Sequence, residues 1–179
     1  SGSTVGMTAT AVTRQFDSVT DPLRYEMNEQ AFTGGGDFLM KLNGNRYELS
    51  GHFGLSYVAG DSSAIANVQT TSAHYFQRPD ADHLEVDSTA TSLTGYSAAI
   101  ELAKQAGAHW LGHVAAAITA PQYEINDLGF GTRTDRKDLT GTLTYRDIVP
   151  GDFIRDWSVS LHGRREQNFA NQPILAFTN

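Results

Sequence analysis

The chain has 179 residues, the length of one domain, and its 13 Lys and Arg residues against 20 Asp and Glu residues give a net charge of -7 at pH 7. This acidic balance argues against nucleic acid as a partner, because contacts with phosphates require clustered cations. The absence of cysteine excludes disulfides and thiolate metal ligands, and no apolar run reaches the roughly 18 residues of a transmembrane helix.

Apolar and polar side chains alternate with a period of two along most of the chain, which predicts antiparallel β-strands. The clearest unit is residues 91–120, where two alternating stretches flank a turn at 105–108 and predict a long hairpin. The other strands are predicted at 4–16, 37–43, 46–58, 137–148 and 153–165, with an incomplete eighth after 167–172. Val68 to Phe76 is expected to extend a strand, and no helix-period segment of useful length is found.

The predicted connections alternate in length along the chain. Long polar connections are expected at 17–36, 59–91, 121–136 and 166–172, and short ones at 43–45, 105–108 and 149–152. Asn43-Gly44-Asn45 is typical of a type I′ hairpin turn, and Gly34-Gly35-Gly36 is expected to be a flexible loop end. Long loops at one edge and short turns at the other are typical of outer-membrane barrels.

The alternation separates two faces on strands of about ten residues, the length that crosses a bilayer when tilted. The predicted lipid face comprises Tyr47, Leu49, Phe53, Leu55, Tyr96, Ala98, Ile100, Leu102, Val114, Ala116, Ile118, Leu139, Leu143, Trp157, Val159 and Leu161. The predicted lumen face comprises Glu48, His52, Glu101, His113 and Arg146. We therefore expect an all-β, antiparallel up-and-down meander that forms a transmembrane β-barrel, as an arc of a larger barrel. The alternative is a soluble antiparallel sandwich or barrel, which also alternates.

The polar segments offer few arrangements suited to chemistry. His109 and His113 would lie about 13 Å apart along one strand, too far for one metal ion. The acidic run Asp80, Asp82, Glu85 and Asp87 has oxygen ligands for calcium but lacks the glycine and spacing of an EF-hand loop, which favours a solvated loop. Neither a nucleophile elbow nor a catalytic triad is recognisable. The sequence favours a role without catalysis, and we expect no catalytic residue, metal or cofactor.

The segment from Asn126 to Phe130 reads Asn-Asp-Leu-Gly-Phe and is expected to build a fixed loop, because Asn and Asp side chains close local turns and Gly accepts positive φ. Nearby Arg133, Asp135, Arg136 and Lys137 are expected to pair with Asp127 or with the acidic run. The candidates for ligand binding or for loop structuring are Arg78, Asp80, Asp82, Glu124, Asn126, Asp127, Phe130 and Arg133.

Four segments together resemble a known family: Gln77 to Ala81, Ser92 to Tyr96, Lys104 to Trp110, and Glu124 to Phe130. Their order and spacing over about residues 35–148 are similar to a barrel domain of unknown function. Bacteria, notably Bacteroidota and relatives, carry this domain behind an N-terminal carbohydrate-binding domain of the family 9 type. The family pattern usually has Ser-Pro-Gly-Phe-Glu where this chain has Ala-Pro-Gln-Tyr-Glu. We expect the Gln in place of Gly to change the turn.

This resemblance implies an outer-membrane β-barrel of a Gram-negative bacterium whose molecular activity is not established. Residues 1–179 would then be a single barrel segment of a longer chain, as its Ser-Gly-Ser start also leads us to expect. The expected partners are the lipid bilayer, the remaining strands of the parent barrel, and carbohydrate. The function expected first is surface glycan binding or transport. The second hypothesis is a soluble all-β carbohydrate-binding module, in which Tyr and Trp rings stack on sugars.

Overall fold

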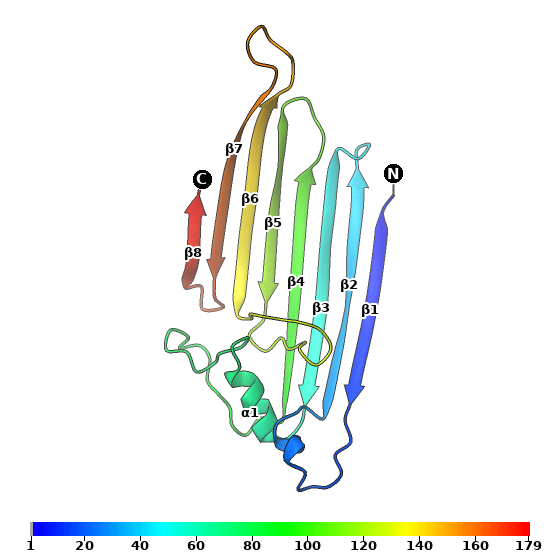
Figure 1. The fold of residues 1–179 in the computed structure, drawn as a ribbon, viewed down its shortest axis with the longest axis vertical. Coiled ribbons are helices and arrows are strands. Elements are labelled where there is room, and N and C mark those ends of the chain that lie inside the picture. Colours follow the sequence, from blue (N-terminus) through cyan, green and yellow to red (C-terminus); the bar gives the residue numbers. More distant parts are fainter. Residues whose placement is uncertain (1) are drawn as a thin grey trace.

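The computed structural model describes residues 2–179 as one antiparallel sheet in which eight strands pair in sequence order, β1 to β8 (Figure 1). This confirms the predicted all-β meander. The strands are β1 (Thr4–Thr13), β2 (Gln30–Leu42), β3 (Tyr47–Ala59), β4 (Ser92–Lys104), β5 (Trp110–Thr119), β6 (Arg136–Asp147), β7 (Trp157–Gln167) and β8 (Pro173–Thr178). The sheet is open, because β1 and β8 do not pair with each other.

Three of the four connections at the loop edge are long. They cover residues 14–29, 60–91 and 120–135, whereas the fourth, 168–172, is as short as the turn at 105–109, so the long connection predicted at 166–172 is wrong. The turn edge carries the connections 43–46, 105–109 and 148–156. The tight turn predicted at 149–152 is wrong, since β7 begins at Trp157 and not at 153. Pro150 has no N–H to donate to a ladder, and all residues from 148 to 156 are exposed. The β6–β7 ladder therefore ends at the pair of Asp147 and Trp157.

The prediction of a strand from Val68 to Phe76 is also wrong. Helix α1 (Ser62–Thr70) occupies the first part of this connection, and a short 3-10 helix, η1 (Pro22–Tyr25), lies in the 14–29 connection. Asp61 caps α1 by accepting a hydrogen bond from the Ser63 backbone N–H, and the fully buried Ile65 and Gln69 lie one turn apart. No helix among the described residues is long and apolar enough to cross a membrane.

The three consecutive glycines lie inside β2 and not in a flexible loop, so this strand starts seven residues earlier than predicted, while β1 ends at Thr13 and not at 16. Gly35 faces Gly54 across the β2–β3 pair. A Cβ at Gly35 would overlap the carbonyl oxygen of Phe53, so the two strands approach too closely for any side chain there. The glycines therefore mark close packing of strands.

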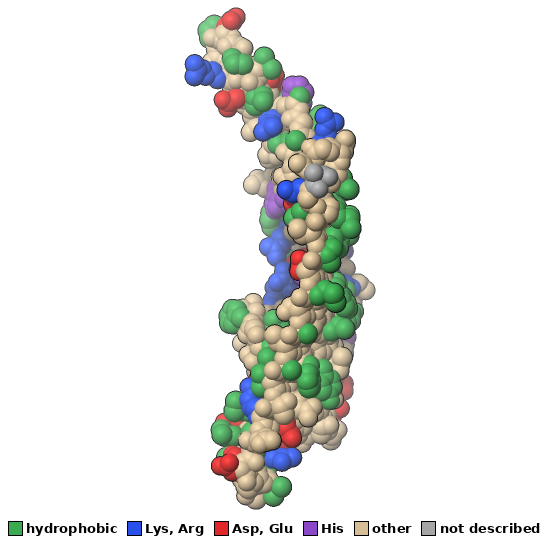
Figure 2. Space-filling view, turned by 90° about the vertical axis from the view of Figure 1, so that its right-hand side faces the viewer, with side chains coloured by type: hydrophobic (Ala, Val, Ile, Leu, Met, Phe, Trp, Pro, Cys, Tyr) green, Lys and Arg blue, Asp and Glu red, His purple; other side chains and the backbone are tan. Residues whose placement is uncertain are grey.

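The register aligns the apolar residues of successive strands on one side of the sheet. Leu49 pairs with Leu102, and Leu102 pairs with Val114, so all three point the same way. We define the apolar face by its large aliphatic and aromatic residues Val5, Met7, Phe32, Phe38, Met40, Leu42, Tyr47, Leu49, Phe53, Leu55, Tyr57, Tyr96, Ile100, Leu102, Trp110, Val114, Ile118, Leu139, Leu143, Tyr145, Trp157, Val159 and Leu161. Figure 2 shows the sheet edge-on and curved, with hydrophobic side chains along its convex side.

The opposite, concave side is the polar face, and it carries the only buried apolar cluster among the described residues. Ala31, Val58 and Leu93 from β2, β3 and β4 pack against Ile65 of α1 near the loop edge. The apolar face has no such cover, and Ile100 and Val114 remain 51% and 49% exposed there. The larger apolar surface of this fold is therefore left without a partner inside the chain.

Candidate functional site

The four loop-edge connections (14–29, 60–91, 120–135 and 168–172) form what we call the loop cluster, part of which folds back over the polar face. Segment 120–135 crosses in front of the lower strands in Figure 1. A Cβ at Gly95 would overlap the Tyr123 backbone, and the Glu124 N–H donates to Ser56 Oγ at 3.0 Å. The small residues Ser56 of β3 and Gly95 of β4 thus allow this loop to pack directly on the sheet.

Glu124 and His74 form a buried pair that joins two loops. His74 Nε2 lies 2.7 Å from Glu124 Oε2, and His74 Nδ1 lies 2.7 Å from the carbonyl oxygen of Pro121. The other Glu124 oxygen accepts the N–H of Asn126. Burial raises the pKa of Glu124, but the hydrogen bonds from His74 and Asn126 more than offset it, so the net effect lowers that pKa from its ordinary value of 4.5.

Acid is expected to loosen the 120–135 loop while the strands persist. A carboxyl whose pKa is lowered by folding stabilises the fold above its unfolded pKa, and this contribution is lost as the pH falls through the folded pKa. Amide protection factors of residues 124–131 should therefore fall once the pH drops below 4.5. In Glu124→Gln the loop should already be less protected at neutral pH and should lack this acid step; an identical pH profile in both proteins would contradict the assignment.

Asp135 is the most deeply buried node of the loop cluster, with no exposed surface and a positive φ of 53°. Its carboxylate accepts a hydrogen bond from Arg78 and lies 3.0 Å from His83 Nε2. It also accepts the N–H of Phe169 at 3.0 Å. The Asp135 carboxylate thus links three of the four loop-edge segments, 60–91, 120–135 and 168–172.

Further ion pairs attach the other loops. Asp127 pairs with Arg14 at 2.6 Å, which joins segments 120–135 and 14–29. Arg133 pairs with the buried Glu166 of β7 at 2.5 Å. Asn126 Oδ1 accepts the Gly131 N–H at 2.8 Å and closes the loop that contains Gly129. Each of these carboxylates already has a cation or N–H partner, so the network fixes the loops.

The structure brings six of the eight candidate residues into this network and leaves two outside it. Those inside are Arg78, Glu124, Asn126, Asp127, Arg133 and the exposed Asp80, which pairs with Arg78 at 3.5 Å. Those outside are Asp82 and Phe130, which are exposed at the surface. The expected pairing of Asp127 with the nearby basic residues is wrong, because the partner is the distant Arg14. Sequence reasoning missed His74, Glu166 and Arg14, because their partners Glu124, Arg133 and Asp127 are distant in the sequence and leave no local pattern. Among residues 2–179, no three His, Asp or Glu side chains are placed to hold one metal ion.

A hollow of about 270 Å³ lies on the polar face beside the loop cluster. Its polar walls are Thr8, Thr33, Asp37, His52 and Tyr123, and Ile125 and Leu128 add apolar surface. Asp37 and His52 are opposite each other on β2 and β3, and both are exposed. Burial raises the pKa of Tyr123, so its hydroxyl stays protonated and able to donate. The hollow therefore offers hydrogen-bond donors, acceptors and one aromatic ring to a small polar ligand.

Aromatic residues form two rows at opposite ends of the apolar face. At the turn edge, Tyr145 lies 5.0 Å from Trp110 and 5.3 Å from Trp157 between ring centroids. At the loop edge, Phe32 and Tyr57 lie 6.1 Å apart. Within the described chain, the charged residues on this face lie near the strand ends, as Lys104, Lys137, Asp147 and Arg165. An uncharged band therefore separates the two rows.

The fold and this surface define an open antiparallel strand wall with one uncovered apolar face and one polar face that carries a fixed loop cluster. The chain belongs to the family described as a domain of unknown function, DUF5916, whose model matches residues 3–178. No curated protein and no solved structure matches the chain. The match covers nearly every strand and loop considered above.

Proposed function

We propose that this chain forms part of the wall of a transmembrane β-barrel in the outer membrane of a Gram-negative bacterium. The observation that supports this most strongly is the uncharged apolar band between two aromatic rows on the apolar face. Figure 2 shows the hydrophobic side chains of this face along the convex side of the sheet. Aromatic girdles at both interfaces, with an apolar band between them, are typical of such barrels.

The height of the band supports the same proposal. Tyr47 of the turn-edge row and Tyr57 of the loop-edge row stand at opposite ends of β3. Ten residue steps of about 3.3 Å span about 33 Å along the strand. At the usual tilt of about 40° this projects to about 25 Å, the height of the apolar band in outer-membrane barrels.

The two unpaired edge strands, β1 and β8, indicate which partners this chain needs. β1 and β8 each present backbone N–H and C=O groups to one side without a neighbouring strand in the sheet. In a bilayer such groups would remain unsatisfied, at several kcal/mol each. We therefore propose that further strands of a parent barrel pair with both edges, so that this chain contributes an arc.

The polar face would then line the lumen, and the loop cluster would narrow it at one end. We propose that this interior binds or passes a surface glycan without catalysis. The support is the hollow on the polar face, because Asp37, His52 and the Tyr123 hydroxyl can bond sugar hydroxyls while the tyrosine ring packs on a sugar face.

Refolding of the complete chain into vesicles tests the membrane proposal. Vesicles of phosphatidylcholine brominated on its acyl chains should quench the fluorescence of Trp110 and Trp157, which are about half exposed on the apolar face. Without lipid, the uncovered apolar face should drive aggregation. A compact monomer in buffer, with native β-sheet circular dichroism and no bromine quenching on addition of vesicles, would overturn the proposal and favour a soluble binding module.

A further inference from the structure

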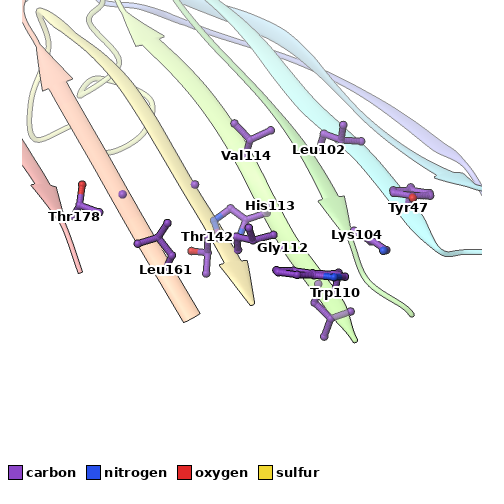
Figure 3. Close-up of a pocket in the computed structure, with 14 residues that line it drawn as sticks. Tyr47, Leu102, Lys104, Trp110, Gly112, His113, Val114, Thr142, Leu161 and Thr178 are labelled. Atoms are coloured by element: carbon purple, nitrogen blue, oxygen red, sulfur yellow. The ribbon is translucent and has the colours of Figure 1, made fainter. Parts of the chain in front are cut away.

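Two glycines open a groove on the apolar face across β6 and β7, and the groove extends to β5. Gly141 pairs directly with Gly163, and a Cβ at either position would meet no atom closer than 3.5 Å. At Gly112 of β5 a Cβ would overlap the carbonyl oxygen of Thr142, so this glycine marks close packing of the strands. Because Gly141 and Gly163 have no side chain, a hollow of about 450 Å³ remains between larger residues (Figure 3). Its apolar walls are Leu102, Val114, Leu143 and Leu161.

The turn-edge end of the groove differs from its apolar walls. Figure 3 places Trp110, Lys104 and Tyr47 together at this end, away from Val114. No carboxylate of the described residues lies within 4.0 Å of the Lys104 ammonium group, although the chain has 20 acidic residues. The groove is therefore an apolar channel that ends at an unpaired cation and an indole ring.

We propose that this groove binds an anionic phospholipid, with one acyl chain over the glycines and the phosphate at Lys104. An apolar chain with an anionic end matches both parts of the groove in polarity and in charge. The Trp110 indole suits the level of the headgroups, where tryptophan concentrates in membrane proteins. This inference rests on the proposed orientation of the apolar face toward lipid and adds to it a preferred lipid class.

A second copy of this chain is a poorer occupant. The groove occupies only the space that side chains would fill at the glycine positions. This narrow space suits one hydrocarbon chain better than the broad face of another sheet. A facing copy would also bring a second Lys104, and like charges in an apolar contact repel. The charge at the end of the groove therefore selects an anionic partner.

The lipid preference can be measured with Trp110 as the only reporter. In Trp157→Phe, refolded into equimolar phosphatidylglycerol and phosphatidylcholine, bromine is placed on the acyl chains of one lipid or the other. Brominated phosphatidylglycerol should quench Trp110 about fivefold more strongly than brominated phosphatidylcholine, the effect of one lysine at an anionic surface. Lys104→Gln should remove this difference.

Two matched controls separate the groove from general effects. Lys41→Gln removes a turn-edge lysine from the polar face and should keep the preference. Gly163→Leu should fill the groove and remove the preference, whereas Gly34→Leu, on the same face of β2, should not. A Cβ at either glycine meets no atom closer than 3.7 Å, so both variants should fold.

The outcomes also separate this inference from the membrane proposal. Equal quenching by both lipids, or a preference that survives Lys104→Gln and Gly163→Leu, would overturn the groove while leaving the membrane orientation supported. Loss of quenching as the protein concentration rises would assign the groove to a second copy and would also overturn the inference. Absence of quenching by either lipid would overturn the membrane proposal and the groove with it.

Discussion

Val114→Arg is expected to destabilise the chain in a bilayer by about 2–4 kcal/mol, the cost of a cation on the lipid face near the midplane. Val114 lies near the middle of β5 on the apolar face, where it pairs with Leu102 and Gly141 and its side chain is 49% exposed. In lipid vesicles, urea unfolding of this variant should have its midpoint at a clearly lower concentration than in the parent protein. In water the same change should have little effect, since the side chain contacts no core.

The adjacent residue provides the control. His113 belongs to the same strand but points to the polar face, and its side chain makes no hydrogen bond that a substitution would break. His113→Arg should change the unfolding midpoint in vesicles by much less, because an arginine facing an aqueous lumen keeps its hydration. Equal losses from the two variants would contradict the assignment of the two faces.

This division of the faces was predictable from sequence because a strand pattern is local and has a period of two. Tyr47, Leu49, Phe53 and Leu55 identify their face without knowledge of any partner strand. The order β1 to β8 also follows locally, since hairpins join neighbours in sequence. Whether the sheet lies in a bilayer depends on what covers its apolar face. The alternation of apolar and polar residues does not reveal this, because it is the same in a membrane barrel and in a soluble β-protein.

Errors occurred where a second signal competed with alternation. The three glycines of β2 are typical of a loop, but Gly35 is required by close contact with β3, which no local pattern reveals. Helix α1 has only nine residues, too short for a clear period, although Asp61 followed by Ser62 was a usable capping signal.

The loop cluster was less predictable than the sheet because its contacts are long-range. His74 and Glu124 are 50 residues apart, and Arg78 and Asp135 are 57 apart. Sequence alone identified Asn126 and Asp127 as candidates through their local turn chemistry, and Glu124 through the segment that resembles the family. It could not provide their partners, because the fold of the sheet brings the four loops to one edge.

Asp135→Asn is expected to open the loop cluster and should cost about 3–5 kcal/mol locally, the usual penalty for removing one partner of a buried ion pair. Asparagine keeps the size of the side chain and tolerates the positive φ at this position, so the substitution changes only the charge and the hydrogen bonds of residue 135. Arg78 would keep only the exposed Asp80, at 3.5 Å. Hydrogen exchange of residues 78–83 and 168–172 should become at least a hundredfold faster, since each 1.4 kcal/mol corresponds to about a factor of ten.

The strands should respond differently, because their ladders do not depend on this carboxylate. Exchange within β3 and β4 should stay close to that of the parent protein, since loops and sheet can open as separate units. Asp82→Asn is the matched control: it removes an exposed carboxylate from the same connection and should change exchange by less than about 0.5 kcal/mol. If Asp135→Asn left the loops protected, or melted the whole sheet with them, Asp135 would not be the node that holds the loop cluster on the wall.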